Sequence, residues 1–519
     1  MTRRTFLGTP AALPAMQARA QTAPRNAARP GLPNILFIMA DQVTPFMISP
    51  YGCAAAKTPN LARLAREGTI FENAYCPSPL CVPSRSSMWS GRLPTAITSF
   101  DNGSEFFAHL PTIPYLLRTA GYRTAVSGKC HFIGPDQLHG FDERLTPCIF
   151  PAGFSMTPNW KLGPVYNKGT SIQATMRALG PSKWTKQLGF DQYAFEQGLA
   201  RLQQHAAARD PEPLCLTVSF TQPHDPFTTT KEFLDLYNGV DIPMPKDYGD
   251  IRRLSPTYEW FIIHHGLNRE KLSPEQIREA RRNYLGMISW VDSRIGMLLD
   301  ELDRLGLAAN TAVVFTSDHG EMMGEHGQWS KRLLLEWSAR VPLIVRLPGG
   351  ARPPARITQP VSTLDLLPTF NDLAGAKTDL PFDGTSLLPL LRGGAENPNA
   401  SVICEYLGEG TIEPERMLRS GRHKYIIVNG YGPQLFDLKE DPNETVNLAG
   451  RSEYRAVEAE LAKKIGVGWD GPALKRTAIT DQQQRLLIQS LAKSTPRWDY
   501  VVHTPGPYLR DAGVRDTIR

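Results

Sequence analysis

The chain has 519 residues, of which 41% are hydrophobic and 21% charged, the composition of a globular protein. This length exceeds one small core and predicts one large domain with a smaller one. The formal net charge is +6, but residues 1–30 hold five arginines and no acid, which leaves +1 for the remainder. That balance excludes a nucleic-acid-binding surface as the expected function. No apolar run reaches the ~18–20 residues that a membrane helix needs.

The N-terminus has the features of an export signal. Thr2–Gly8 contains a twin arginine followed by Phe-Leu and resembles a Tat signal. A weakly apolar stretch follows, and Ala18–Ala20 reads Ala-Arg-Ala, which predicts cleavage near residue 20. Residues 1–30 are therefore expected to be the leader and linker of a periplasmic or otherwise exported protein. The alternative is a disordered basic tail on a cytoplasmic protein, because Pro10 and Pro14 interrupt the apolar stretch.

Residues 31–390 alternate between apolar runs and amphipathic helical stretches. The first run is continuously apolar, which predicts a strand buried on both faces, as in a parallel sheet. Repetition of the strand–helix order predicts a doubly wound, mostly parallel α/β sheet. Residues 132–190, rich in Pro, Gly and aromatics, are expected to form an ordered lid-like insertion. The expected strands are 33–40, 69–75, 122–127, 214–220, 312–317 and 341–345, and the expected helices are 58–68, 84–89, 111–120, 191–204, 273–302 and one beginning at 363.

The pattern changes after about residue 385. Short strands are expected at 401–406, 424–428 and 434–438, and a helix at 454–464. These elements predict a smaller C-terminal α+β domain over residues 391–519. It ends in a helix that begins near residue 477, followed by an irregular basic and aromatic tail.

Polar residues follow several of the predicted strands. The carboxyl ends of parallel strands meet at one edge of the sheet, where open α/β sheets place their sites. A single residue of this kind is more often a cap or turn former, so the coincidence of several carries the prediction. The residues concerned are Asp41, Gln42, Cys81, Lys129, His131, His224, Asp318 and His319.

Cys81 stands where a strand region passes into a predicted helix. A helix N-terminus favours the thiolate form of a cysteine. Arg85 follows one turn later on the same face, so the pair could bind an oxyanion ester. The alternative is a small buried cysteine in a turn that contains Pro83.

Oxygen and nitrogen donors at the strand ends predict a cation site. Asp41, Asp318 and the amide oxygen of Gln42 suit a hard divalent cation. His319 adds a nitrogen donor, which tolerates Mn²⁺ as well as Ca²⁺. For the Asp-His-Gly sequence at 318–320 alone, a simple polar turn is the alternative.

Basic residues near these donors predict an anion site. Arg85, Lys129 and Lys331 can donate to a sulfate or phosphate. His131 and His224 titrate in the range that suits proton transfer near neutral pH. Each of them alone could equally be a surface charge or a structural histidine.

Two segments identify a resemblance to a known family. Cys81–Arg85, with Ser86–Gly91 behind it, resembles the first signature of the type I, formylglycine-dependent sulfatases, and Gly121–His131 is similar to the second. The resemblance extends over residues 33–519. It implies an alkaline-phosphatase-like fold and hydrolysis of a small-molecule sulfate ester. It also implies that a formylglycine-generating enzyme oxidises Cys81 to Cα-formylglycine.

The same resemblance implies roles for individual residues. It places one divalent metal ion, Ca²⁺ or Mn²⁺, between Asp41, Gln42, Asp318 and His319, with the modified Cys81 touching it. Sulfate-binding and catalytic roles are implied for Arg85, Asn102, Lys129, His131, His224 and Lys331.

Gln42 and His319 resemble the residues of the choline-sulfatase and phosphonate-hydrolase branch. Most sulfatases have Asp at the position of Gln42 and often have Asn or Gln at the position of His319. That branch often favours Mn²⁺. Longer segments similar to choline-sulfatases are 134–141, 336–342, 405–410 and 498–499. They imply choline O-sulfate as substrate and a pocket that contains Met156, Glu405 and Asp499. In that family the C-terminal tail reaches a neighbouring subunit, which implies a homo-oligomer.

Two features depart from the choline-sulfatase pattern. Met156 stands where that family has a tryptophan, which removes a cation–π contact of roughly 0.5–2 kcal/mol with a trimethylammonium group. The leader is also unlike the usual cytoplasmic choline enzymes. Alternatives therefore stay open: an exported sulfatase for a carbohydrate or another alkyl or aryl sulfate, a hydrolase of phosphonates or of phosphate mono- or diesters, or a catalytically silent metal- or anion-binding homologue.

Overall fold

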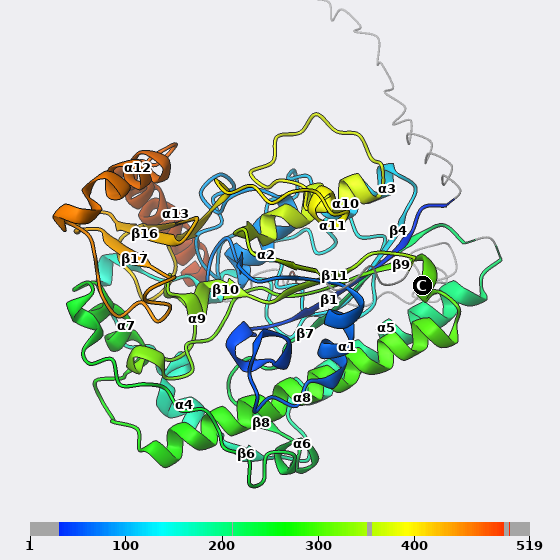
Figure 1. Cartoon of the computed structure of the whole chain (residues 1–519), viewed down its shortest axis with the longest axis horizontal. Helices are drawn as coiled ribbons and strands as arrows, with labels where there is room; N and C mark the ends of the chain where they lie inside the picture. Colours follow the sequence, from blue (N-terminus) through cyan, green and yellow to red (C-terminus); the bar gives the residue numbers. More distant parts are fainter. Residues whose placement is uncertain (1–30, 210, 350–354, 492–497, 499–519) are drawn as a thin grey trace, which may run out of the picture.

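The computed structural model describes residues 31–209, 211–349, 355–491 and 498. An eight-stranded sheet, with helices on both faces, fills the larger part of the molecule, and a four-stranded antiparallel sheet lies to one side of it (Figure 1). The predicted α/β class with a smaller C-terminal α+β part is therefore confirmed. The leader, its cleavage site near residue 20 and Asp499 lie outside the described residues, and the boundary near residue 390 stays a prediction.

The large sheet has the strand order β12-β2-β11-β9-β1-β7-β4-β5. Its centre is parallel, as predicted: β1 (Asn34–Ala40) lies between β9 (Thr311–Ser317) and β7 (Leu214–Phe220), and β4 (Arg123–Gly128) follows β7. Every residue of β1, β7 and β9 is buried, which explains their continuous apolar sequences. The short β5 (Glu143–Arg144) closes this edge.

The other half of the sheet differs from a purely doubly wound pattern. β11 (Leu343–Arg346) runs antiparallel to both β9 and β2 (Thr69–Phe71), and β12 (Ala355–Ile357) pairs parallel with β2. The strand expected at 341–345 is divided at Pro342, which has no N–H to donate. Likewise the strand expected at 69–75 is divided. Its second part, β3 (Ala74–Tyr75), joins β10 (Arg340–Val341) and β13 (Val361–Ser362) in a separate small sheet.

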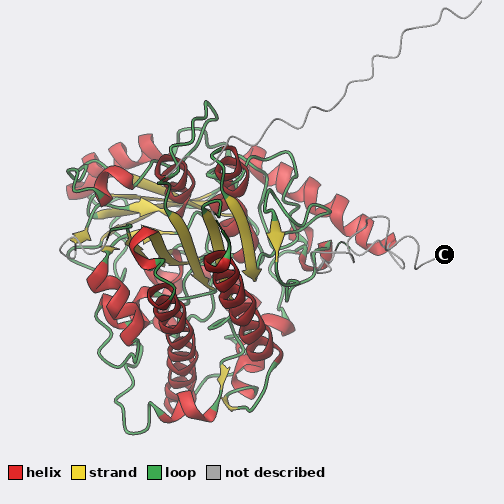
Figure 2. Ribbon diagram, turned by 90° about the vertical axis from the view of Figure 1, so that its right-hand side faces the viewer, coloured by secondary structure: helices red, strands yellow, loops and turns green. Residues whose placement is uncertain are grey.

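Alternate residues of β1 enter two different cores. Leu36 and Ile38 pack with the side chains of α5 (Lys186–Ala207) and α8 (Pro274–Arg304), the long helices along one face of the sheet (Figure 2). Phe37 and Met39 point to the other face, which is covered by three further helices. These are α2 (Cys81–Ser90), α3 (Ile113–Thr119) and α10 (Leu366–Leu373). α1 (Pro59–Glu67) joins the first layer.

The remaining elements are short. The 132–190 insertion is ordered, as expected, and holds α4 (Ile172–Arg177), β6 (Gly180–Pro181) and single 3₁₀ turns. β6 pairs with β8 (Thr228–Thr229). The others are α6 (Lys231–Asp235), α7 (Tyr258–His265), α9 (Glu336–Ala339) and α11 (Leu388–Leu391). Among the described residues, no helix has the length and apolarity required to cross a membrane.

The smaller sheet contains a strand that the sequence did not indicate. Its order is β14 (Ser401–Tyr406), β15 (Glu415–Ser420), β16 (His423–Val428) and β17 (Gln434–Asp437), with α12 (Arg455–Ile465) packed against it. β15 carries three ionisable residues yet is buried throughout, and its arginines find partners inside the protein, such as Arg416 with Glu405. α13 (Gly471–Leu491) follows and lies beside the 154–162 turns.

Glu415 in β15 gives a prediction about stability. Burial raises the pKa of its carboxyl from 4.5 to about 8, and one carboxyl oxygen has no hydrogen-bond partner. The folded state therefore holds a proton that the unfolded state releases. This contribution to stability is present at acid pH and is lost as the pH rises from about 4.5 to 8, by up to ~1.4 kcal/mol per pH unit. We expect Glu415→Gln to flatten the fall in unfolding free energy over this range in urea titrations, whereas Glu270→Gln, at an exposed position, should not.

Candidate active site

The strand ends bring four metal-ligating side chains together. Asp41 follows β1, Asp318 and His319 follow β9, and Cys81 begins α2. One donor atom from each lies within 4.8 Å of the others, and all four residues are buried. Cys81 Sγ is 3.2 Å from His319 Nε2, which is 3.5 Å from Asp41 Oδ1. The convergence predicted from the sequence is thus present in the structure.

The electrostatics of this cluster suit a cation. Burial, together with the charges of Asp318 and Cys81, raises the pKa of Asp41. Burial alone would also raise the pKa of Asp318, but Arg85 holds it well below its usual value. Two carboxylates of this kind and a histidine nitrogen form a donor set that fits Ca²⁺ or Mn²⁺. The residues present therefore fit the divalent ion that the sequence predicts.

Arg85 and Lys129 lie against the acidic side chains. Arg85 Nε donates to Asp318 Oδ2 at 2.7 Å, and its Nη1 donates to the Lys129 carbonyl at 2.8 Å and to Ser219 Oγ at 3.0 Å. Its Nη2 is buried and has no hydrogen-bond partner. Lys129 forms an ion pair with Asp41. An unpaired guanidinium N–H beside a lysine is a donor arrangement that matches an oxyanion.

Gln42 lies in the site, but its side chain has other partners. Its Oε1 accepts a hydrogen bond from Lys331 Nζ at 2.6 Å. Its Nε2 donates to Glu321 Oε2 at 2.5 Å and to Asp225 Oδ1 at 3.2 Å. The amide oxygen that the sequence assigns to the metal is therefore bonded to Lys331. Glu321 and Asp225 were not predicted as site residues, although each follows a recognised strand end by a few residues.

The two histidines differ in their surroundings. His224 contacts Lys331 Nζ through Nε2 at 2.7 Å and the Asp225 carbonyl through Nδ1 at 2.7 Å. Burial alone would lower its pKa, but Asp225 and Asp41 raise it. Burial lowers the pKa of His131 to about 4, and its ring stacks on Phe150 with centroids 4.5 Å apart. The centroid of the Phe150 ring also lies 4.5 Å from Lys129 Nζ. No feature of the sequence indicated that Phe150 belongs to the site.

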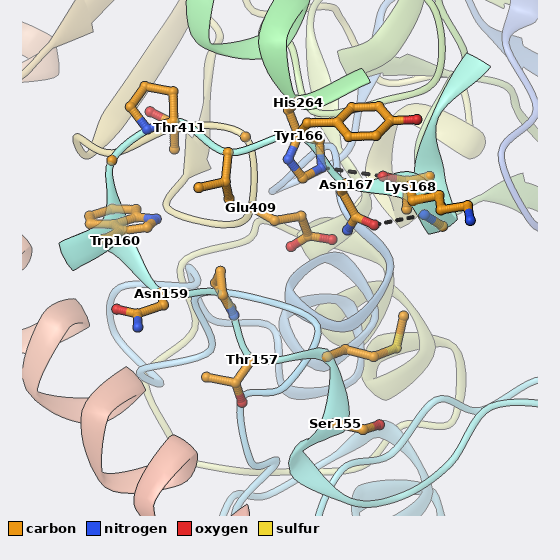
Figure 3. A pocket seen from close by; sticks show the side chains of 18 residues that line it. Ser155, Thr157, Asn159, Trp160, Tyr166, Asn167, Lys168, His264, Glu409 and Thr411 are labelled. Atoms are coloured by element: carbon orange, nitrogen blue, oxygen red, sulfur yellow. Dashed lines mark hydrogen bonds between the residues drawn. The ribbon is translucent and has the colours of Figure 1, made fainter. Parts of the chain in front are cut away.

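The structure also contains a pocket of about 540 Å³ (Figure 3). Residues 155–160 and 163–170, His264 and the 409–411 turn line it. Asn102 connects it to Cys81, since its Oδ1 accepts from the Val82 N–H at 3.0 Å and its Nδ2 donates to Glu409 Oε1 at 3.2 Å. Glu409 also pairs with Arg332 at 3.2 Å, while its second oxygen is buried without a partner.

The residues predicted for the substrate pocket do not all line it. Met156 lines the pocket. Glu405 is fully buried in β14, where its carboxylate binds Arg416 at 2.5 Å and Thr95, and it is not among the lining residues. The carboxylate that lines the pocket is Glu409, four residues later in the same segment. Strand β14 ends at Tyr406, so the following turn rather than the strand faces the pocket.

Comparisons with known proteins agree with this geometry. The sulfatase family model matches residues 33–376, and the model of the N-sulphoglucosamine sulphohydrolase C-terminal region matches residues 324–467. The choline-sulfatase of Rhizobium meliloti (strain 1021) is 36% identical over 484 residues, which cover 91% of this chain and 94% of that protein. An N-acetylglucosamine-6-O-sulfatase of Bacteroides thetaiotaomicron is 27% identical, over 83% and 85% of the two chains.

Solved structures give the same fold. A putative sulfatase from Bacteroides thetaiotaomicron superimposes with a TM-score of 0.66 at 26% identity, covering 93% of this chain and 99% of its own. The phosphonate monoester hydrolase of Agrobacterium radiobacter has a TM-score of 0.68 at 24% identity, over 86% and 96% of the chains. The protein belongs to the sulfatase family, and its activity is that of a sulfuric ester hydrolase.

Proposed function

We propose that this protein hydrolyses choline O-sulfate to choline and sulfate, using Cα-formylglycine at position 81 and one divalent metal ion. The observation that carries the chemistry is the buried cluster of Asp41, Cys81, Asp318 and His319. The choline part rests on the 36% identity to a choline-sulfatase and on the free oxygen of Glu409 in the pocket. A formylglycine-generating enzyme would be the required partner.

Position 81 would supply the attacking group. As Cα-formylglycine, residue 81 supplies in its hydrated form the hydroxyl that attacks sulfur. A bound Ca²⁺ or Mn²⁺ would be held by Asp41, Asp318 and His319, with Gln42 as the further ligand proposed from the sequence, and would supply positive charge beside the sulfate and that hydroxyl.

The basic residues hold the sulfate group. Arg85 offers its unpaired Nη2, Lys129 pairs with Asp41, and Lys331 donates to the neighbouring Gln42. Such fixed cations stabilise the charge that develops on the equatorial oxygens in the transition state. Asn102 orients the start of the helix that carries residue 81, because it accepts the Val82 N–H.

The two histidines move protons. His224, held between Lys331 and Asp225, would protonate the departing alkoxide oxygen. His131 keeps both ring nitrogens free of other partners among the described groups, which leaves it able to take a proton at residue 81 when sulfate is released. Phe150, stacked on His131, orients that ring and limits the access of water.

The pocket offers groups that suit a quaternary ammonium alcohol. The free carboxylate oxygen of Glu409 supplies negative charge, and the rings of Trp160 and Tyr166 line the same space (Figure 3). Quaternary ammonium groups bind to aromatic faces and carboxylates in this way. Met156 adds a polarisable thioether in place of a further ring. Asp499 stays a proposed contributor from the tail.

Glu409→Gln tests the proposed substrate. The amide keeps an acceptor for Asn102 and Arg332 but loses the charge, so KM for choline O-sulfate should rise roughly tenfold, the equivalent of about 1.4 kcal/mol. The KM of an uncharged ester, 4-nitrophenyl sulfate, should change less than twofold. Glu405→Gln is the matched comparison, because its carboxylate is bound to Arg416 and should affect thermal stability rather than the KM difference.

A carbohydrate sulfatase is the second candidate. The pocket of about 540 Å³ is larger than a trimethylammonium group requires, and an N-acetylglucosamine-6-O-sulfatase is among the relatives. Comparing kcat/KM for choline O-sulfate, N-acetylglucosamine 6-sulfate and 4-nitrophenyl sulfate separates the two. A phosphonate monoester in the same panel tests the hydrolase activity named for the Agrobacterium structure.

Export and assembly complete the proposal. The twin-arginine leader would direct the protein to the periplasm, and the tail after residue 491 would join copies into a homo-oligomer. The mass of the protein recovered from the periplasm shows whether cleavage occurs near residue 20. Light scattering during size-exclusion chromatography gives the number of subunits.

A further inference from the structure

The C-terminal helix α13 is joined to the active-site loop by a buried ion pair. Arg485 is 4% exposed, and its Nη1 and Nη2 donate to the two oxygens of Asp101 at 2.7 and 2.8 Å. Nη1 also donates to Thr157 Oγ1 at 2.9 Å, in the wall of the pocket. Asp481 on the same helix accepts from Nη2 at 2.6 Å. Arg485 therefore binds both the loop that contains Asp101 and the 132–190 insertion.

Asp101 directly precedes the residue that connects pocket and nucleophile. Its side chain is fully buried, so without Arg485 it would be an uncompensated charge in the interior. The next residue, Asn102, accepts the Val82 N–H and donates to Glu409. A shift of Asp101 would therefore move Asn102, and with it both the start of α2 and the free carboxylate of the pocket.

Other residues of α13 hold the facing wall. Gln482 Oε1 accepts the backbone N–H of Trp160 at 3.0 Å, and Gln483 Nε2 donates to Asn159 Oδ1 at 2.9 Å. Asn159 and Trp160 are labelled in Figure 3. Ala478 packs in one apolar cluster with Phe100, Trp160 and Leu407. The fit is close at Gly103, where a Cβ would lie 2.3 Å from Thr157 Oγ1 and 2.7 Å from Arg485 Nη1.

We propose that α13 supports the wall of the substrate pocket and that Arg485 is a positioning residue for the reaction, acting through Asp101 and Asn102. The helix lies beyond residue 467, where the matched family regions end, so those regions do not account for it. The effect on choline selectivity rests on the function proposed for Glu409. The effect on sulfate-ester hydrolysis itself does not.

The test compares three variants of the full-length protein with two substrates. Arg485→Met should lower kcat/KM for 4-nitrophenyl sulfate and choline O-sulfate by roughly 10- to 100-fold, since a displacement of about 1 Å in a reacting group has an effect of this size. Arg485→Lys, which keeps the charge, should recover most of the loss in kcat. Arg476→Met is the matched control, because it makes the same change at an exposed position of the same helix, and it should stay within twofold of the wild type.

Melting temperatures separate positioning from stability. A folded Arg485→Met protein with kcat/KM within twofold of the wild type would overturn the proposal, as would equal losses in Arg485→Met and Arg476→Met. If Arg485→Met does not fold, Gln482→Met removes only the bond to the Trp160 N–H. It should raise KM for choline O-sulfate with kcat nearly unchanged, and an unchanged KM would overturn the role of α13. A wild type active on 4-nitrophenyl sulfate alone would refute the choline substrate without affecting the role of Arg485.

Discussion

Cys81→Ala is expected to abolish sulfate release from every ester, with a fall in kcat of at least about 10⁴-fold, because removal of a nucleophile leaves only binding and charge stabilisation. Cys81→Ser should be nearly as inactive when no enzyme is present to oxidise it. The thiol is deeply buried beside Asp41 and His319, the side chains proposed to hold the metal ion. Release of sulfate, followed by ion chromatography, is the measurement.

Mass spectrometry of the peptide containing residue 81 connects this loss to the modification. Wild-type activity should scale with the fraction of that peptide carrying formylglycine and should rise when a formylglycine-generating enzyme is co-expressed. Cys53→Ala is the control, since this cysteine lies outside the metal cluster and its loss should leave kcat within twofold. Full turnover by a protein that holds only unmodified Cys81 would contradict the formylglycine proposal.

The centre of the fold was predictable because its strands are buried on both faces. β1, β7 and β9 have continuous apolar sequences, and they agree with the expected ranges to within a residue. β15 was not predictable, because its arginines are bound by partners elsewhere in the chain, such as Tyr75, which accepts a hydrogen bond from Arg419. The antiparallel direction of β11 could not be predicted from the sequence either, because it depends on the path of the chain between β9 and β11 and not on local periodicity.

Some residues of the candidate site could likewise be predicted from the sequence, and others could not. Side chains at the ends of parallel strands could be grouped from the sequence, because the topology brings these ends to one edge. Glu409, Phe150 and Arg485 could not, since they come from a turn, the lid and a C-terminal helix, whose positions depend on tertiary packing. Glu405 and Glu409 lie in one recognised segment, and the sequence did not show that β14 ends between them, so that Glu409 lines the pocket.

The surroundings of His224 hold its ring in place, as the proposed role of a proton donor requires. Lys331 Nζ lies 2.7 Å from its Nε2, and the Asp225 carbonyl lies 2.7 Å from its Nδ1, so both ring nitrogens are held in place. Lys331 in turn is bonded to Gln42, which binds Asp318 through its own N–H at 3.1 Å. The ring is thereby fixed relative to the acidic cluster, as a general acid must be relative to the leaving oxygen.

His224→Ala should consequently harm poor leaving groups most. For an alkyl ester such as choline O-sulfate, kcat/KM is expected to fall by roughly 10²- to 10⁴-fold, the usual size of general acid catalysis. For 4-nitrophenyl sulfate, whose phenolate departs without a proton, the fall should be less than tenfold. A plot of log kcat/KM against leaving-group pKa should therefore be steeper for the variant than for the wild type, while His109→Ala, at an exposed position, should reproduce the wild-type slope. Equal losses for alkyl and aryl esters would instead place His224 in a step common to both, the binding or release of sulfate.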